Sequence, residues 1–159
     1  MSTEPPPDAT FTSTPHPTHQ LHVPEDKHDL ACISILLEHP YTANLRPLAP
    51  TLLTWLQDGN WPIFDGVTKV LLRIPEAVVE PVREVLRGDD DAWQYYCLGY
   101  LLPYMRRKEL KELRSDIEAL RTRTEGGYGE DWDIREEIDI VMGKIDEESG
   151  EEGKKEREE

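Results

Sequence analysis

The chain has 159 residues, of which 37% are hydrophobic and four are tryptophan, and this suffices for one domain with a hydrophobic core. Its formal net charge of −15 is concentrated near the C-terminus, because residues 25–124 carry a net −3 and residues 125–159 a net −10. That balance argues against general binding of nucleic acid or anionic lipid, since both ligands require a cationic surface.

Three patterns predict a reduced, intracellular protein, cytoplasmic or alternatively nuclear. Residues 1–8 contain neither the basic nor the apolar region of a secretory signal. No stretch approaches the roughly 18 apolar residues that a membrane-spanning helix needs. Cys32 and Cys97 fall within apolar helical patterns, where a free cysteine behaves as a small buried hydrophobic residue.

Residues 1–23 are rich in proline, threonine and serine, and this composition predicts a disordered arm. His16, His19 and His22 recur in it every three residues. Three imidazoles at this spacing could bind a transition metal, but no cysteine or carboxylate completes the ligand set. An extended proline-rich segment has three residues per turn in any case. We therefore predict a solvated arm, with no metal or cofactor site.

Three helices are predicted after this arm. The first begins near residues 24–29, where Asp26 can cap the exposed N–H groups, and it ends before Pro40. The second starts at about Pro47, and the third follows a turn at residues 58–61. The side chains predicted to face inward are Leu30, Ile33, Leu36 and Leu37, then Leu48, Leu52, Trp55 and Leu56, then Ile63, Val67, Val70, Leu71 and Ile74.

Four further helices precede a disordered charged tail, which is predicted for residues 147–159. Pro75 opens the fourth helix, which Gly88 can terminate, and acids at residues 89–91 mark the start of the fifth. Pro103 closes or kinks that helix. The predicted inward side chains are Val78, Val82, Val85 and Leu86; Trp93, Cys97, Tyr100, Leu101 and Tyr104; Leu110, Leu113, Ile117 and Leu120; and Ile134, Ile138, Val141, Met142 and Ile145. No strand is predicted.

A repeat relates the helices to one another. Trp61 and Trp93 each stand at a helix start and are 32 residues apart, and the same step back from Trp61 reaches Asp29. We therefore predict an all-α fold over residues 24–146, a short HEAT-like α-solenoid of about three helix pairs with the seventh helix as a C-terminal cap. Three pairs are close to the minimum for a stable array of this kind.

Three sequence blocks resemble a small domain-of-unknown-function family of bacteria and fungi, family 5071. The blocks are Pro24–Asp29, Trp55–Pro62 and Asp89–Trp93, the last followed by Cys97-Leu98 and Leu101–Pro103. The resemblance covers about residues 20–122 and implies an all-helical domain similar to HEAT repeats, with no established activity. Gly59 stands where a larger apolar residue, often methionine, is expected, so we expect a looser bend at this corner.

Polar residues and tryptophans at the helix starts form a candidate binding edge. If the helix pairs stack in register, these side chains collect along one side of the domain. The candidate residues are Lys27, His28, Asp29, Asp58, Asn60, Trp61, Asp65, Asp90 and Trp93. The alternative role is structural: the acids and Asn60 would cap helices, and the tryptophans would fill gaps between repeats.

The sequence holds no complete catalytic set, so we predict a non-enzymatic module that binds a protein or peptide partner. The alternative is an enzyme acting at the Asp58–Asp65 edge, because Trp61, Asp65 and Trp93 superficially match the tryptophan and aspartate set of HEAT-like alkylpurine DNA glycosylases. Such enzymes need a cationic groove, which a domain with a net −3 does not provide. Nucleic acid and membrane are therefore not expected partners, and the oligomeric state is left open.

Overall fold

The computed structural model describes residues 20–125 and 133–147, and over these residues the chain is helical without strands, as predicted. The α-helices are α1 (Leu30–Glu38), α2 (Ala49–Leu53), α3 (Phe64–Leu72), α4 (Pro75–Arg87), α5 (Asp91–Tyr96), α6 (Arg107–Thr124) and α7 (Arg135–Asp146). Short 3₁₀ turns are η1 (Thr42–Asn44), η2 (Arg46–Leu48), η3 (Thr54–Leu56) and η5 (Leu102–Tyr104), and η4 (Cys97–Leu101) is a π-helical turn. The predicted arm and tail lie outside the described residues.

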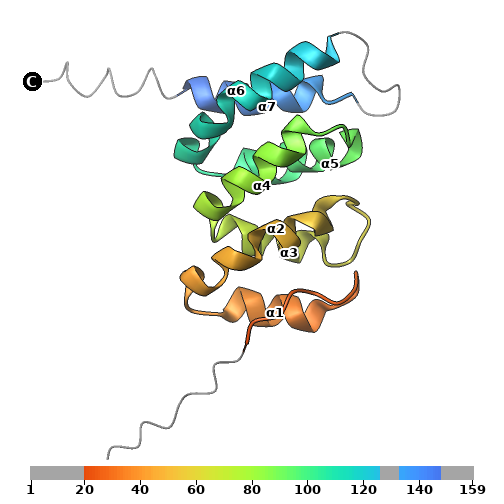
Figure 1. Ribbon diagram of the computed structural model, residues 1–159, viewed down its shortest axis with the longest axis vertical. Coiled ribbons are helices and arrows are strands. Elements are labelled where there is room, and N and C mark those ends of the chain that lie inside the picture. The colour runs from red at the N-terminus through yellow and green to blue at the C-terminus, as the bar shows by residue number, and fades with distance from the viewer. Residues whose placement is uncertain (1–19, 126–132, 148–159) are drawn as a thin grey trace, which may run out of the picture.

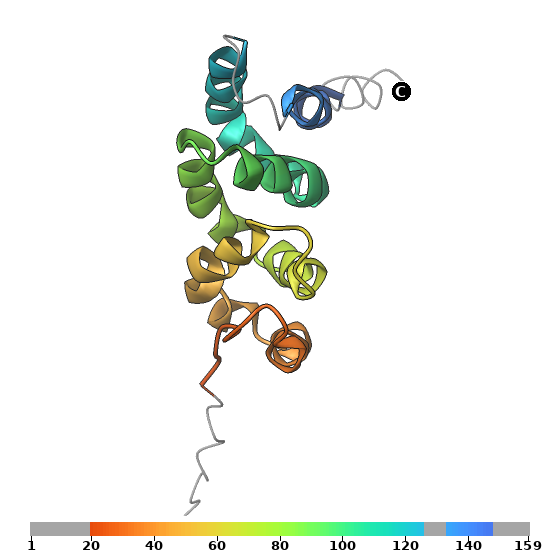
Figure 2. The same cartoon turned by 90° about the vertical axis from the view of Figure 1, so that its right-hand side faces the viewer.

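The helices stack in two layers, which Figure 2 shows as two columns. One layer holds α2, α4 and α6, and the other holds α1, α3, α5 and α7. Contacts run along each layer, from α2 to α4 to α6 and from α1 to α3 to η4 to α7. Each described helix after α1 therefore crosses to the layer opposite its predecessor, and the stack is elongated along this direction (Figure 1).

The helix starts follow local chemistry, with one correction to the predicted caps. Asp29 caps α1 by accepting from the Cys32 N–H at 3.1 Å, whereas Asp26 accepts from the His28 N–H in the preceding turn. The prediction of Asp26 as the cap was therefore wrong, since the chain becomes helical only at Leu30. Pro75 opens α4, where its missing N–H has no intrahelical partner to lose.

Three residues that were predicted to face inward are instead exposed. Leu30 is 54% exposed because it is the first residue of α1, ahead of the buried stripe that begins at Ile33. Tyr100 is 45% exposed and Tyr104 is 70% exposed. Both lie in the π and 3₁₀ turns that follow α5, where the rotation per residue differs from the 100° that an α-helical stripe assumes.

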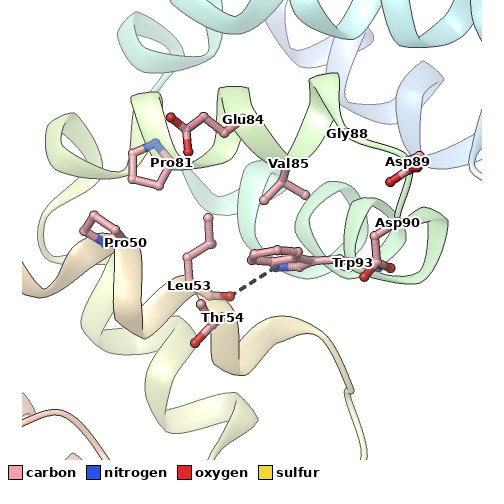
Figure 3. A pocket seen from close by; sticks show the side chains of 10 residues that line it. All are labelled: Pro50, Leu53, Thr54, Pro81, Glu84, Val85, Gly88, Asp89, Asp90 and Trp93. Atoms are coloured by element: carbon pink, nitrogen blue, oxygen red, sulfur yellow. Dashed lines mark hydrogen bonds between the residues drawn. The ribbon is translucent and has the colours of Figure 1, made fainter.

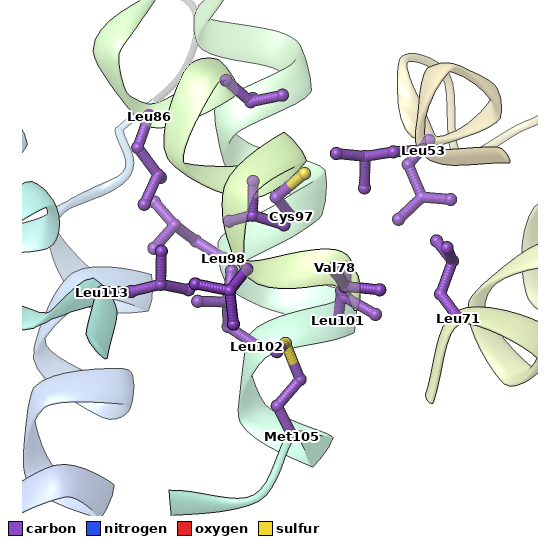
Figure 4. Close-up of a cluster of buried hydrophobic side chains, with 14 of the residues drawn as sticks. Leu53, Leu71, Val78, Leu86, Cys97, Leu98, Leu101, Leu102, Met105 and Leu113 are labelled. Carbon is purple, nitrogen blue, oxygen red and sulfur yellow. The ribbon is translucent and has the colours of Figure 1, made fainter. Parts of the chain in front are cut away.

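One continuous hydrophobic core fills the space between the layers (Figure 4). Leu71 of α3, Val78 of α4 and Leu101 of η4 are each at most 1% exposed, so neighbouring helices share one core. Cys97 is buried in the same cluster, and burial raises the pKa of its thiol well above the ordinary range. Cys32 and Cys97 are both free cysteines.

Helix α7 buries its apolar stripe against the end of the stack. Ile134, Ile138 and Val141 are at most 2% exposed, and α7 packs on α6 and on the turns η4 and η5. Arg114 of α6 pairs with Asp146 of α7 at 2.9 Å. The seventh helix, predicted as a C-terminal cap, thus packs onto the sixth and closes this end of the core.

Candidate functional site

The segments that lead into α1, α3 and α5 lie along one edge of the stack, on the right in Figure 1. All three helices belong to the same layer and begin at that edge. The predicted helix-start residues therefore share one side of the molecule. Their side-chain contacts, however, divide them into separate local groups.

In the corner before α3, the polar side chains form hydrogen bonds within their own turn. Asp58 Oδ1 accepts from the Asn60 backbone N–H at 2.9 Å and from Asn60 Nδ2 at 3.0 Å. Trp61 is half-buried and packs edge-on against Trp55, with ring centroids 5.5 Å apart. Helix α3 starts only at Phe64 without a side-chain cap, so the prediction that Asp58 and Asn60 cap it was wrong.

Gly59 makes this corner tighter than expected. An ideal Cβ at this position would lie 2.5 Å from Cε1 of Tyr96, well inside contact distance. The absence of a side chain lets the Tyr96 ring of α5 approach the turn directly. The expected loosening of the bend is therefore replaced by close packing between this corner and the C-terminal residue of α5.

The start of α5 carries both a cap and a contact to α2. Asp90 accepts from the Trp93 backbone N–H at 2.9 Å, which confirms it as a helix cap. The Trp93 indole Nε1 donates to the carbonyl of Leu53 at 3.1 Å, and this carbonyl lies at the C-terminus of α2. Trp93 thus fills the space between two helices of the stack while staying half-buried.

The other predicted edge residues do not join these groups. Lys27 and His28 are exposed, and Asp29 is occupied as the α1 cap and by the Glu25 N–H at 3.0 Å. Asp65 is exposed in the first turn of α3. These four residues share the edge with Trp61 and Trp93, but no side-chain hydrogen bond, ion pair or ring contact connects them to either tryptophan.

A hollow of about 360 Å³ opens beside Trp93, between α2, α4 and the start of α5 (Figure 3). Its apolar wall and floor are formed by Pro50, Leu53, Pro81, Val85 and Trp93. The polar groups around it are Thr54, Glu84, Gly88, Asp89 and Asp90. Among the described residues no lysine, arginine or histidine lines it, so the only charged side chains at the hollow are carboxylates.

Of the residues that line this hollow, the predicted binding edge contained Asp90 and Trp93, and Asp89 was predicted to mark the start of the fifth helix. The remaining lining residues come from α2 and α4, whose side-by-side packing follows from the stack. One signal was available: Leu53 and Val85 are 32 residues apart, the same spacing that relates Trp61 to Trp93. Applied to apolar positions, the repeat would have placed these two residues at equivalent points on neighbouring helices.

A second hollow, of about 740 Å³, lies on the outer face of α1 at the end of the stack. The segment before α1 forms one side of it, and the Cys32 thiol donates to the His22 carbonyl at 3.1 Å. Burial, together with Asp29 and Glu25, raises the pKa of the Cys32 thiol. The thiol is therefore a packed donor and a poor nucleophile at neutral pH.

Aromatic rings gather where α3 meets α5 and η4. The ring centroids of Phe64, Tyr96 and Tyr100 lie 5.4–5.9 Å from one another, and Tyr95 packs edge-on against Tyr96 at 5.4 Å. Burial, followed by the neighbouring Tyr100 and Glu137, raises the pKa of Tyr95. The cluster joins α3, α5 and η4 within one layer through ring contacts, and the helical spacing of the sequence did not predict it as a unit.

Metal-ligand clusters and membrane-spanning helices are both absent among the described residues. No three or more His, Cys, Asp or Glu side chains among them are grouped so that they could hold a metal ion. Of the histidines considered for a metal, His16 and His19 lie outside the described residues, and His22 is exposed. No helix in this part of the chain is both long enough and apolar enough to cross a membrane.

A comparison with protein-family models matches residues 22–142 to a family described as a domain of unknown function, DUF5071. The match runs from the segment before α1 into α7, so it includes α1 to α6 and the first part of α7. It extends beyond the range of about 20–122 that the sequence blocks suggested. A comparison with curated proteins finds no match.

Proposed function

The chain belongs to the DUF5071 family, a domain of unknown function, and from its own side chains we propose that it binds a protein or peptide partner. The partner docks at the helix-start edge, with the hollow beside Trp93 as the central contact. The observation that carries this proposal is the hollow itself, with its apolar floor, its half-buried tryptophan and its carboxylate rim.

We also propose that the stack is a short HEAT-like α-solenoid. The alternation of helices between two layers and the 32-residue spacing support this proposal. In such arrays each helix pair buries its apolar face only against its neighbours. The grooves between successive pairs then remain open along an edge, and they serve as extended binding surfaces.

The composition of the hollow suits a protein contact. Trp is among the residues that most often dominate binding energy at interfaces, especially in a pocket with an apolar surround. Trp93 is fixed by its bond to Leu53, so binding would cost little side-chain ordering. Asn60, Trp61 and Asp65 lie along the same edge and would extend the contact beyond the hollow.

Filling the hollow tests this function. Thr54 is exposed at the rim, and Thr54→Trp would occupy the space with little effect on the core. Ser115→Trp places the same bulk on an exposed position of α6, away from the hollow, and serves as the control. Immobilised full-length wild type and both variants are compared for the proteins they retain from an extract of the source cells.

We expect wild type and Ser115→Trp to retain a common set of proteins that Thr54→Trp loses. Circular dichroism must first show that both variants keep the helical content of wild type. Retention of the same proteins by Thr54→Trp would refute binding at the hollow.

A further inference from the structure

We propose that the partner segment is cationic, and that it places an arginine side chain in the hollow beside Trp93. This inference rests on the proposed function, because it names the chemistry of the peptide that docks there. Its basis is the charge and shape of the hollow.

The charge of the hollow is uncompensated. Glu84 and Asp89 are exposed, and neither side chain has an ion pair or hydrogen bond within the described residues. Other acids of α4 do have partners: Glu76 pairs with Arg46, and Glu80 pairs with Arg83. The carboxylates at the hollow therefore remain available to a positively charged group from outside.

An anionic ligand does not fit the same place. The start of α5 offers N–H groups, but Asp90 accepts from the Trp93 N–H at 2.9 Å and Asp91 accepts from the Ala92 N–H at 3.0 Å. These carboxylates occupy the amides and reverse the local charge. With Glu84 and Asp89 nearby, the field at the hollow is negative and attracts cations.

The shape of the hollow favours arginine among cationic side chains. Figure 3 shows the Trp93 indole between Leu53 and Val85, with Glu84 toward one side of the hollow and Asp89 and Asp90 toward the other. A planar guanidinium can stack on an indole and donate to carboxylates at the same time. The aliphatic stem of arginine would lie along the apolar wall that Pro50 and Pro81 form.

The experiment uses immobilised full-length protein and a library of capped hexapeptides. Each sub-library fixes one position as arginine, lysine, citrulline or glutamate and randomises the others. Citrulline keeps the shape of arginine without its charge. Retained peptides are identified by mass spectrometry, and fluorescence anisotropy then compares the best arginine peptide with its citrulline counterpart.

We expect arginine peptides to be enriched among the retained peptides. They should bind about tenfold more tightly than their citrulline counterparts, because only arginine, with its positive charge, makes ion-paired hydrogen bonds to the two exposed carboxylates. The double variant Glu84→Lys/Asp89→Lys should lose this preference. Glu112→Lys, which reverses an exposed acid of α6, should bind within about twofold of wild type.

Three outcomes would overturn the inference, and they differ in what else they refute. Equal binding of arginine and citrulline peptides removes the cationic requirement but leaves peptide binding intact. An arginine preference that persists in the Glu84→Lys/Asp89→Lys variant places the cation elsewhere. Failure of every sub-library to bind refutes both this inference and the peptide-binding function.

Discussion

Arg73 links the C-terminus of one helix to that of another. It follows the last residue of α3, and its guanidinium donates to the carbonyls of Leu36 and Leu37 at 2.8 and 2.9 Å and of His39 at 2.6 Å. These carbonyls end α1 and lack intrahelical donors. A cation here also lies favourably at the negative end of the α1 dipole. One side chain thus supplies donors to three carbonyls at the end of a neighbouring helix.

Removing the Arg73 side chain should lower the stability of the fold. We expect Arg73→Ala to reduce the free energy of unfolding by about 2–3 kcal/mol, because it leaves carbonyls at a partly buried helix end without charged donors. Lys69→Ala removes the same charge from an exposed position one turn earlier on α3, and we expect a change within about 0.5 kcal/mol. Urea unfolding measures both, and equal losses would contradict a role beyond charge.

The contacts of Asn60 change the stability loss that is expected when it is replaced by alanine. As a helix cap, its replacement by alanine would cost about 1 kcal/mol. The side chain is exposed and only donates to Asp58 within its own turn. The expected loss is therefore smaller, and Asn60 remains free to take part in binding at the edge.

At the scale of elements, charged side chains join helices of the same layer. Asp116 of α6 is 7% exposed and accepts from Arg83 at 2.9 Å and from Arg87 at 2.8 Å, both on α4. Glu76 at the start of α4 pairs with Arg46 of η2 and with Arg106 before α6. These pairs tie α4 to its neighbours on both sides.

Glu76 makes part of this linkage dependent on pH. Its pKa lies below the ordinary 4.5, first because its carboxylate accepts from its own backbone N–H and further because of Arg46 and Arg106. A lowered folded-state pKa means that the stabilisation is present above pH 4.5 and is lost as pH falls through the lowered value.

Glu76→Gln should therefore destabilise the protein at pH 7 and have a vanishing effect under strongly acidic conditions. The side chain is 38% exposed, so solvent screening limits the loss to at most about 1 kcal/mol. Urea unfolding between pH 7 and pH 3 measures the difference, with Glu112→Gln as an exposed control acid. A difference from wild type that stays constant with pH would contradict the assignment.

At the scale of the whole molecule, contacts connect each helix mainly to its neighbours in the stack. Helix α1 packs on α3 at one end, and α7 packs on α6 at the other. For the solenoid that we propose, local openings are expected to begin at an end and spread through adjacent elements. A core substitution at one end should consequently destabilise the helices at that end and leave the other end unaffected.

Matched core deletions at the two ends test this behaviour. Ile138→Ala in α7 and Ile33→Ala in α1 each remove a buried side chain and should cost about 2–4 kcal/mol locally. Hydrogen exchange of backbone amides should accelerate mostly in α6 and α7 for Ile138→Ala and mostly in α1 and α3 for Ile33→Ala. Uniform acceleration along the chain in both variants would show a single cooperative unit instead.

The sequence by itself determined the all-helical class and most inward faces, because helical periodicity is a local property of the chain. The buried stripe of α3, from Val67 to Leu71, and the Asp90 cap both follow from spacing over a few residues. The prediction of an inward face was wrong at Tyr100 and Tyr104, because π and 3₁₀ turns change the helical period there.

Only the tertiary structure decided which side chains meet across the stack. Trp93 reaches a carbonyl 40 positions earlier, and Arg73 reaches one 37 positions earlier. The hollow exists because α2 and α4 lie side by side, so that Pro50 and Glu84 line the same hollow as Trp93 of α5. Such contacts depend on how helices dock, which propensity and spacing do not specify. The candidate residues were therefore predictable as helix starts, whereas the acidic hollow was not predictable as a site.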